Sequence, residues 1–181
     1  MRGTALLASL VPLCAWCQVP EGPAWSIRIG PSFGQTTIGS EDTRRGTVWS
    51  VGYSRPEPRL TFKGTKADLM LEGYYFFNRG GGFEDIPVNT MHSWGALATA
   101  RYRLKEVKGT GVHFDLSWGL VYNSIRTRDL DSRFNSTPSL GIGVSRGRYD
   151  FTIRFFHMSN GGTSGNNQGS NNIQYLFSWR I

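Results

Sequence analysis

Cysteine is almost absent from this chain of 181 residues. Its two cysteines, Cys14 and Cys17, both lie in an N-terminal segment with the features of an export signal. Once such a segment is removed, no disulfide and no cysteine-based metal site can form. The three histidines, His92, His113 and His157, are far apart and show no metal-ligand spacing. Neither a calcium-binding loop nor an HExxH motif is present, so the sequence predicts no metal and no other cofactor.

Clusters of basic residues are also missing, although the formal net charge is +7. Lys and Arg are scattered along the chain, without a basic helix or a Lys/Arg-rich run, which argues against nucleic acid as a partner. An anionic lipid surface suits an exported basic protein better. Basic loops without a specific partner are an equally good interpretation.

Long apolar runs are absent too, and the N-terminal one is short. Arg2 is followed by an apolar stretch over residues 5–11, and the small residues Ala15 and Cys17 precede a predicted cleavage site before Gln18. A membrane-spanning helix needs about 20 apolar residues, so a membrane helix is the weaker alternative. Acylation of Cys17 is disfavoured by the bulky Trp16. We expect a signal peptide over residues 1–17 and, without a linker or an internal repeat, a single domain over residues 18–181.

After residue 25 the sequence alternates between apolar and polar residues and shows no convincing helical periodicity. Alternate residues of a strand share one face, so each such run predicts a strand with one apolar and one polar face. Most of the runs are about ten residues long, the length of a strand that crosses a membrane. Eight runs alternate in this way, over residues 25–33, 47–54, 68–77, 93–104, 112–123, 139–145, 149–159 and 172–181.

The polar phase of these runs contains charged residues, and aromatic residues recur at the ends. A soluble sandwich also alternates, but it rarely places Trp and Tyr at so many strand ends. A transmembrane barrel turns apolar residues to lipid, polar or small ones inward and aromatics to both interfaces, and it has no open edges. The pattern therefore predicts an all-β fold, an eight-stranded antiparallel transmembrane β-barrel. The residues expected to face lipid include Trp118, Phe151 and Tyr175, and those expected inside include Asp115, Arg154 and Gln174.

The run that ends near residue 159 carries a possible catalytic pair. His157 and Ser159 are two residues apart and so lie on the same face of a strand. A serine hydroxyl becomes a good nucleophile when an adjacent base accepts its proton. Asn171 has the parity to approach His157 if the last two runs form a hairpin, and the Gly-rich residues 161–169 between them could turn N–H groups toward an oxyanion. The alternative is an ordinary surface loop after a strand that happens to end in His and Ser.

At these residues the chain resembles the outer-membrane lipid A 3-O-deacylases, the PagL-like acyloxyacyl hydrolases. Weaker similarity extends over most of the chain after the signal segment. The resemblance implies an eight-stranded barrel whose active site opens on the outside of its wall, toward the membrane. The motif is H-x-S-N-x-G followed by N-x-G and a polar residue, which here are His157, Ser159, Asn160, Gly162, Asn167, Gly169 and Asn171.

The resemblance also implies roles for these residues. Ser159 would be the nucleophile and His157 the general base, and the oxyanion would be supported by Asn160, Gly162 and Asn167. The chain departs from the best-known members at the third catalytic position, where Asn171 stands in place of an expected Glu.

An asparagine can orient the imidazole through a hydrogen bond but cannot supply the negative charge that stabilises imidazolium. A weaker esterase, or a different orienting acid, would follow from this change. Glu72 and Asp115 belong to the inward phase and are poorly placed for that role.

The expected partner is lipid A, or lipopolysaccharide, in the bacterial outer membrane, with its acyl chains in the bilayer and its phosphates near basic loop residues. The sequence leaves glycerophospholipid open as a substrate. Two other functions also remain open, a non-enzymatic small barrel with a structural or binding role and a lipid A acyltransferase.

Overall fold

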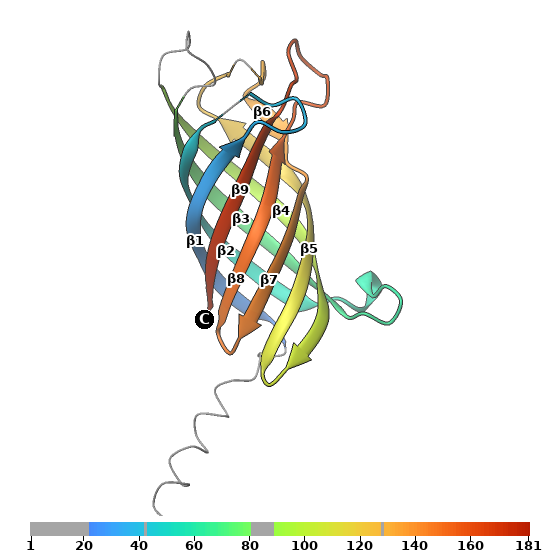
Figure 1. Ribbon diagram of the computed structural model, residues 1–181. Coiled ribbons are helices and arrows are strands. Elements are labelled where there is room, and N and C mark those ends of the chain that lie inside the picture. The colour runs from blue at the N-terminus through green and yellow to red at the C-terminus, as the bar shows by residue number, and fades with distance from the viewer. Residues whose placement is uncertain (1–21, 42, 81–88, 128) are drawn as a thin grey trace, which may run out of the picture.

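The computed structural model describes residues 22–41, 43–80, 89–127 and 129–181, so the predicted signal segment lies outside the described residues. Its strands form a closed antiparallel barrel (Figure 1). No helix in these ranges is long and apolar enough to cross a membrane. The elements are β1 (Ala24–Gln35), β2 (Arg45–Pro56), the short 3₁₀ helix η1 (Pro58–Leu60), β3 (Ala67–Gly80), β4 (Asn89–Val107), β5 (Thr110–Asn123), β6 (Phe134–Ser136), β7 (Ser139–Arg146), β8 (Tyr149–Met158) and β9 (Ser170–Arg180).

Closure of the wall comes from one long-range pairing, between β1 and β9. The sheet runs β4-β3-β2-β1-β9-β8-β7-β5, and β4 also pairs with β5. Pairing of β1 with β9 therefore joins the two ends of the chain, while β6 only adds a short strand to β5. The predicted eight-stranded antiparallel barrel is confirmed.

The two faces of the wall are those that the alternation predicted. Trp118 is 59% exposed, whereas Asp115, three residues earlier on the same strand, is fully buried. Phe151 and Tyr175 likewise face outward, and the inward residues Arg154 and Gln174 are buried. An apolar outer band around a closed barrel is the arrangement that a lipid bilayer requires.

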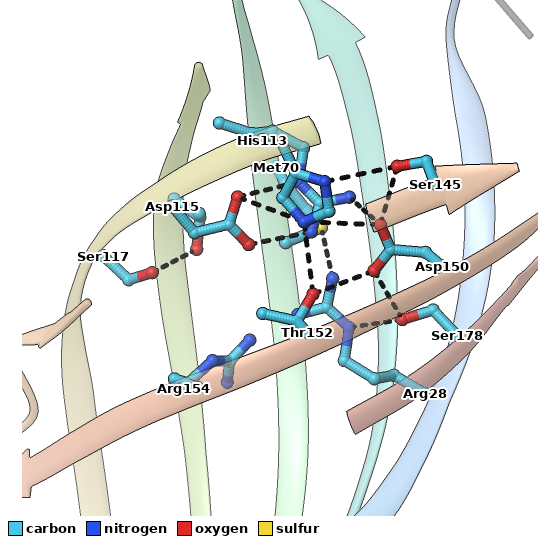
Figure 2. Close-up of polar contacts among 12 residues, drawn as sticks. Arg28, Met70, His113, Asp115, Ser117, Ser145, Asp150, Thr152, Arg154 and Ser178 are labelled. Carbon is cyan, nitrogen blue, oxygen red and sulfur yellow. Dashed lines mark hydrogen bonds and ion pairs between the residues drawn. The ribbon is translucent and has the colours of Figure 1, made fainter. Parts of the chain in front are cut away.

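Charged side chains fill the half of the interior nearer the short turns, and Figure 2 shows part of this polar core. Arg101 donates two hydrogen bonds of 2.8 Å to Asp115 and a third of 2.9 Å to Asp150. Farther from the short turns, Glu72 accepts from Arg28 at 2.8 Å and from Arg154 at 3.0 Å. A barrel of eight strands is just wide enough to be filled by side chains. These ion pairs therefore make a packed core rather than a channel.

The half of the interior nearer the long loops contains an apolar cluster among buried polar residues such as Asn78 and Ser93, and the alternation did not predict this cluster. Phe156 lies at its centre, with ring centroids 5.6 Å from Tyr74 and 6.3 Å from Phe76. Because Phe156 and Met158 are buried here, the end of β8 is held firmly against the interior while His157 points outward. The buried apolar residues are Val48, Tyr74, Phe76, Met91, Leu97, Val121, Leu130, Phe156, Met158 and Leu176.

The connections at the two ends differ in length. Two-residue turns join β4 to β5 and β7 to β8, and the C-terminus lies at this end (Figure 1). Longer segments join β1 to β2, β5 to β7 and β8 to β9 at the opposite end. Transmembrane barrels have short periplasmic turns and longer extracellular loops. The long-loop end of this barrel therefore faces the cell exterior.

Candidate active site

The pairing of β8 with β9 brings two of the predicted site residues together. His157 lies directly opposite Asn171 in the register, as the parity of the two runs predicted. On its other side, His157 N–H donates to the carbonyl of Pro138 at 3.1 Å. Ser159, two residues after His157, exchanges two main-chain hydrogen bonds with Ser136, of 2.8 and 3.0 Å. The backbone around His157 and Ser159 is thus hydrogen-bonded to neighbouring segments on both sides.

A chain of hydrogen bonds determines which nitrogen of His157 carries the proton. The side-chain nitrogen of Asn171 donates to the carbonyl of Thr37, which can only accept. The side-chain oxygen of Asn171 must then face His157, and it lies 2.6 Å from Nδ1 of the imidazole. Nδ1 therefore bears the hydrogen, and Nε2 presents a lone pair that can accept a proton.

The hydroxyl of Ser159 lies within a separate set of hydrogen bonds. It donates to Oδ1 of Asn167 at 3.1 Å and accepts from the N–H of Gly161 at 3.1 Å. Among the described residues, no hydrogen bond joins it to His157. The two side chains share the outer face, so proton transfer between them requires the hydroxyl to turn away from Asn167.

The residues predicted to support an oxyanion form the loop between β8 and β9. The side-chain oxygen of Asn167 accepts from the N–H of Asn160 at 2.9 Å, and that of Asn160 accepts from the N–H of Gly162 at 2.8 Å. Asn160 is buried, and its amide group also donates to the carbonyl of Ser164 at 3.2 Å. With its oxygen so placed, the Nδ2 group of Asn167 donates to no described residue. This amide group therefore remains available to a ligand.

Gly169 allows the imidazole to approach the loop closely. A β-carbon at this position would lie 2.6 Å from Cε1 and 3.4 Å from Nε2 of His157. The backbone φ of Gly169 is +79°, in the region that favours glycine. Gly169 belongs to the sequence motif, but the motif alone did not reveal that this residue lies against the imidazole ring.

An apolar groove of about 350 Å³ runs along the outer wall beside His157. Its volume lies within the range of roughly 300–1,000 Å³ that is usual for small-molecule sites. Ile38 forms part of its edge, is 74% exposed and has a φ of +53°, an uncommon conformation for a β-branched residue. The other lining residues are Leu116, Ser117, Pro138, Ser139, Leu140 and Phe155.

The charge around His157 is low. Within the described ranges, no carboxylate forms an ion pair with this imidazole, and no group of His, Cys, Asp and Glu is placed to hold a metal ion. Glu72 is bound to Arg28 and Arg154 inside the barrel, and Asp115 is bound to Arg101. The expectation that these two acids are poorly placed to orient His157 is confirmed.

Several contributors to the site were missed by sequence reasoning. Thr37 and Ile38 come from the connection between β1 and β2, and Ser136 and Pro138 from the segment before β7. They act through main-chain groups or lie in irregular loops, so no periodic pattern marks them. Only the proximity of β1 to β9 in a closed barrel could have suggested Thr37.

Comparisons with known proteins bear on the fold and the family of this chain. The structure resembles that of the outer membrane enzyme PagL, with a TM-score of 0.65 and 16% sequence identity, over 88% of this chain and 99% of that one. Ail, the attachment invasion locus protein of Yersinia pestis, aligns with 90% of this chain and 100% of its own at 16% identity and a TM-score of 0.43. A search of curated proteins found no match. At these identities the structural likeness concerns the fold alone.

The fold and its outward apolar band define an outer-membrane β-barrel protein. The sequence model of the family described as "Lipid A 3-O-deacylase (PagL)" matches residues 22–180. The chain therefore belongs to the PagL family of lipid A 3-O-deacylases.

Proposed function

We propose that this protein is an esterase that removes the 3-O-linked acyl chain of lipid A by hydrolysis, with Ser159 as nucleophile and His157 as general base. The observation that carries the proposal is the chain from Thr37 through Asn171 to His157, which leaves Nε2 unprotonated at the edge of an apolar groove. Membership of the deacylase family supports the choice of substrate.

The groove suits an amphiphile that stays in the bilayer during the reaction. It lies on the lipid-facing side of the wall, and Phe155, Leu140 and Leu116 line it from three neighbouring strands. An acyl chain that lies along these residues brings its ester to His157 without leaving the hydrocarbon region. The site is at the long-loop end of the barrel, so the substrate is drawn from the outer leaflet, where lipid A resides.

The first chemical step forms an acyl-enzyme. The Ser159 hydroxyl turns from Asn167 to Nε2 of His157, which accepts its proton as Oγ attacks the ester carbonyl. Asn167 Nδ2 then donates to the oxyanion of the tetrahedral intermediate, together with main-chain N–H groups of Asn160 and Gly162 released from their side-chain acceptors. The protonated His157 returns its proton to the sugar oxygen as that ester bond breaks.

The second step releases the fatty acid. Water attacks the acyl group on Ser159 while His157 again accepts a proton, and Oγ leaves as the hydroxyl. Asn171 keeps the ring in the reactive tautomer through both steps but adds no negative charge to stabilise imidazolium. We therefore expect a slower enzyme than one with a carboxylate at this position.

Incubation of lipid A with the folded barrel in water enriched in oxygen-18 tests the proposal. Mass spectrometry should detect a free fatty acid that carries one heavy oxygen and lipid A shortened by one chain. Ser159→Ala should yield neither product, whereas Ser132→Ala, a serine outside the groove, should behave as the wild type. Transfer of the chain to a second lipid would support the acyltransferase instead, and unchanged lipid A with the wild type would support a non-enzymatic barrel.

A further inference from the structure

The connection between β2 and β3 is unlike the other turns at the periplasmic end. β4–β5 and β7–β8 are joined by two residues each, whereas residues 57–66 form a longer projection that includes η1. Figure 1 shows this segment standing out sideways from the barrel wall at the end opposite the long loops. We name residues 57–66 the periplasmic arm.

The tip of the periplasmic arm is a rigid miniature hairpin. Phe62 and Thr65 form an isolated bridge and exchange main-chain hydrogen bonds of 3.2 and 2.9 Å. The two residues between them, Lys63 and Gly64, have positive φ values of 46° and 80°, the signature of a tight primed turn. The direction in which Phe62 points is therefore fixed by the backbone.

The base of the arm is tied to the barrel. The N–H of Glu57 donates to the carbonyl of Ala67 at 2.9 Å, and the N–H of Arg103 on β4 donates to the carbonyl of Lys66 at 3.1 Å. The side chain of Glu57 also caps η1 by accepting from the N–H of Arg59. A segment held at both ends keeps a constant position relative to the wall.

An apolar cleft of about 400 Å³ lies between the arm and the wall. Phe62 and Thr65 contribute one side, and the lipid-facing residues Tyr102, Leu104 and Phe114 of β4 and β5 contribute the other. Phe62 is 62% exposed at the edge of this cleft. Because the wall at this position faces lipid, a hydrocarbon chain is the chemistry that the cleft accommodates.

Positive charge lies next in sequence to the arm residues that line the cleft, with Lys63 after Phe62 and Lys66 after Thr65. Arg59, Lys63 and Lys66 are exposed, and within the described residues none of them forms an ion pair. The ammonium group of Lys63 lies 5.5 Å from the centre of the Phe62 ring, so cation and apolar surface adjoin. The single carboxylate of the arm, on Glu57, already pairs with Arg55 at 3.3 Å.

We infer that the periplasmic arm is a binding site for an anionic glycerophospholipid of the periplasmic leaflet. One acyl chain lies in the cleft against Phe62, and the phosphate binds Lys63 and Lys66. The charge of the arm favours an anionic headgroup over a zwitterionic one. The site is at the opposite end of the barrel from Ser159 and does not depend on the esterase proposal.

Native mass spectrometry of the full, folded chain tests this inference. The protein is released from detergent micelles that contain phosphatidylglycerol or phosphatidylcholine with the same chains. We expect one retained phosphatidylglycerol and at least fivefold less phosphatidylcholine. Each lysine near an anionic lipid raises the affinity for that lipid roughly fivefold. The double variant Lys63→Gln with Lys66→Gln should therefore lower retention of phosphatidylglycerol about 25-fold. Phe62→Ala should lower the retention of both phospholipids about fivefold or more.

A matched control removes two charges from the short turns at the same end. Lys108→Gln with Arg148→Gln should leave retention of phosphatidylglycerol unchanged, and heat-modifiable gel mobility should show that all variants are folded. The inference is overturned if the control lowers retention as much as the variant of the arm does. Equal retention of phosphatidylcholine would also overturn it.

Discussion

Replacement of Asn171 tests the hydrogen-bond chain that prepares His157. In Asn171→Ala the imidazole loses its 2.6 Å partner, so the proton can move to Nε2 and the ring can rotate. Orienting partners of this kind are typically worth 10- to 100-fold in activity. Because Asn171 is fully buried and does not line the groove, we expect kcat to fall roughly 100-fold with little change in KM.

Asn171→Asp separates orientation from charge. One carboxylate oxygen can still accept from Nδ1 of His157 and would now stabilise imidazolium, so kcat should be preserved or raised. The second oxygen replaces the amide that donates to Thr37, and it faces a carbonyl in a buried site. The free energy of unfolding should therefore fall by about 1–3 kcal/mol. Asn171→Glu supplies the same charge but adds a methylene, so overpacking of roughly 1–3 kcal/mol accompanies any gain in rate.

Steady-state kinetics on lipid A in detergent, with gel mobility as a check of folding, measure both effects. The control is Asn172→Ala, which removes the neighbouring amide on the inward face of the same strand. Wild-type kcat in Asn171→Ala would refute the reasoning. An equal loss in Asn172→Ala would show that disturbance of β9, and not the orientation of His157, causes the defect.

Three further predictions concern the close contact at the ring, the lipid-facing wall and the polar core. Gly169→Ala should lower kcat at least tenfold without unfolding the barrel, because the added β-carbon would lie 2.6 Å from Cε1 of His157 and push the imidazole aside. Normal kinetics in this variant would contradict the prediction. Ile142→Arg, on the outer wall, should cost about 2–4 kcal/mol of unfolding free energy in lipid vesicles, and no loss would mean that the faces are reversed. Glu72→Gln should destabilise the barrel by about 3–5 kcal/mol in urea titrations, since two buried guanidinium groups lose their charge partner; a change below about 0.5 kcal/mol would contradict the structure of the core.

Period-two alternation was sufficient to predict the wall of the barrel. It assigned Trp118 and Asp115 to opposite faces and placed Asn171 beside His157, because strand geometry leaves little freedom once the hairpin is assumed. The same rule gave no account of the apolar cluster in the interior nearer the long loops. In β8 the adjacent residues Phe155 and Phe156 are both apolar, although they point to opposite faces of the wall. Such adjacent apolar pairs are the sequence signal that could have indicated apolar packing inside the barrel.

The contacts that hold the proposed catalytic pair, His157 and Ser159, could not be predicted from the sequence. The carbonyl of Thr37 reaches Asn171 from a loop more than a hundred residues away, and Ser136 pairs with Ser159 through the main chain. Main-chain groups are common to all residues and leave no mark in composition or spacing. The contact between Ser159 and Asn167 likewise depends on loop geometry, which alternation does not determine.

The most direct test of the central proposal is a double-mutant comparison on lipid A followed by mass spectrometry. Ser159→Ala and His157→Ala should each remove nearly all deacylation, by roughly 10³-fold or more, and the double mutant should be little worse, because residues that act as one unit are not additive. His92→Ala, a histidine on the outer wall bonded to Tyr75, should retain full activity. Release of the 3-O-linked chain at the wild-type rate by Ser159→Ala would contradict the assignment of this hydroxyl as the nucleophile.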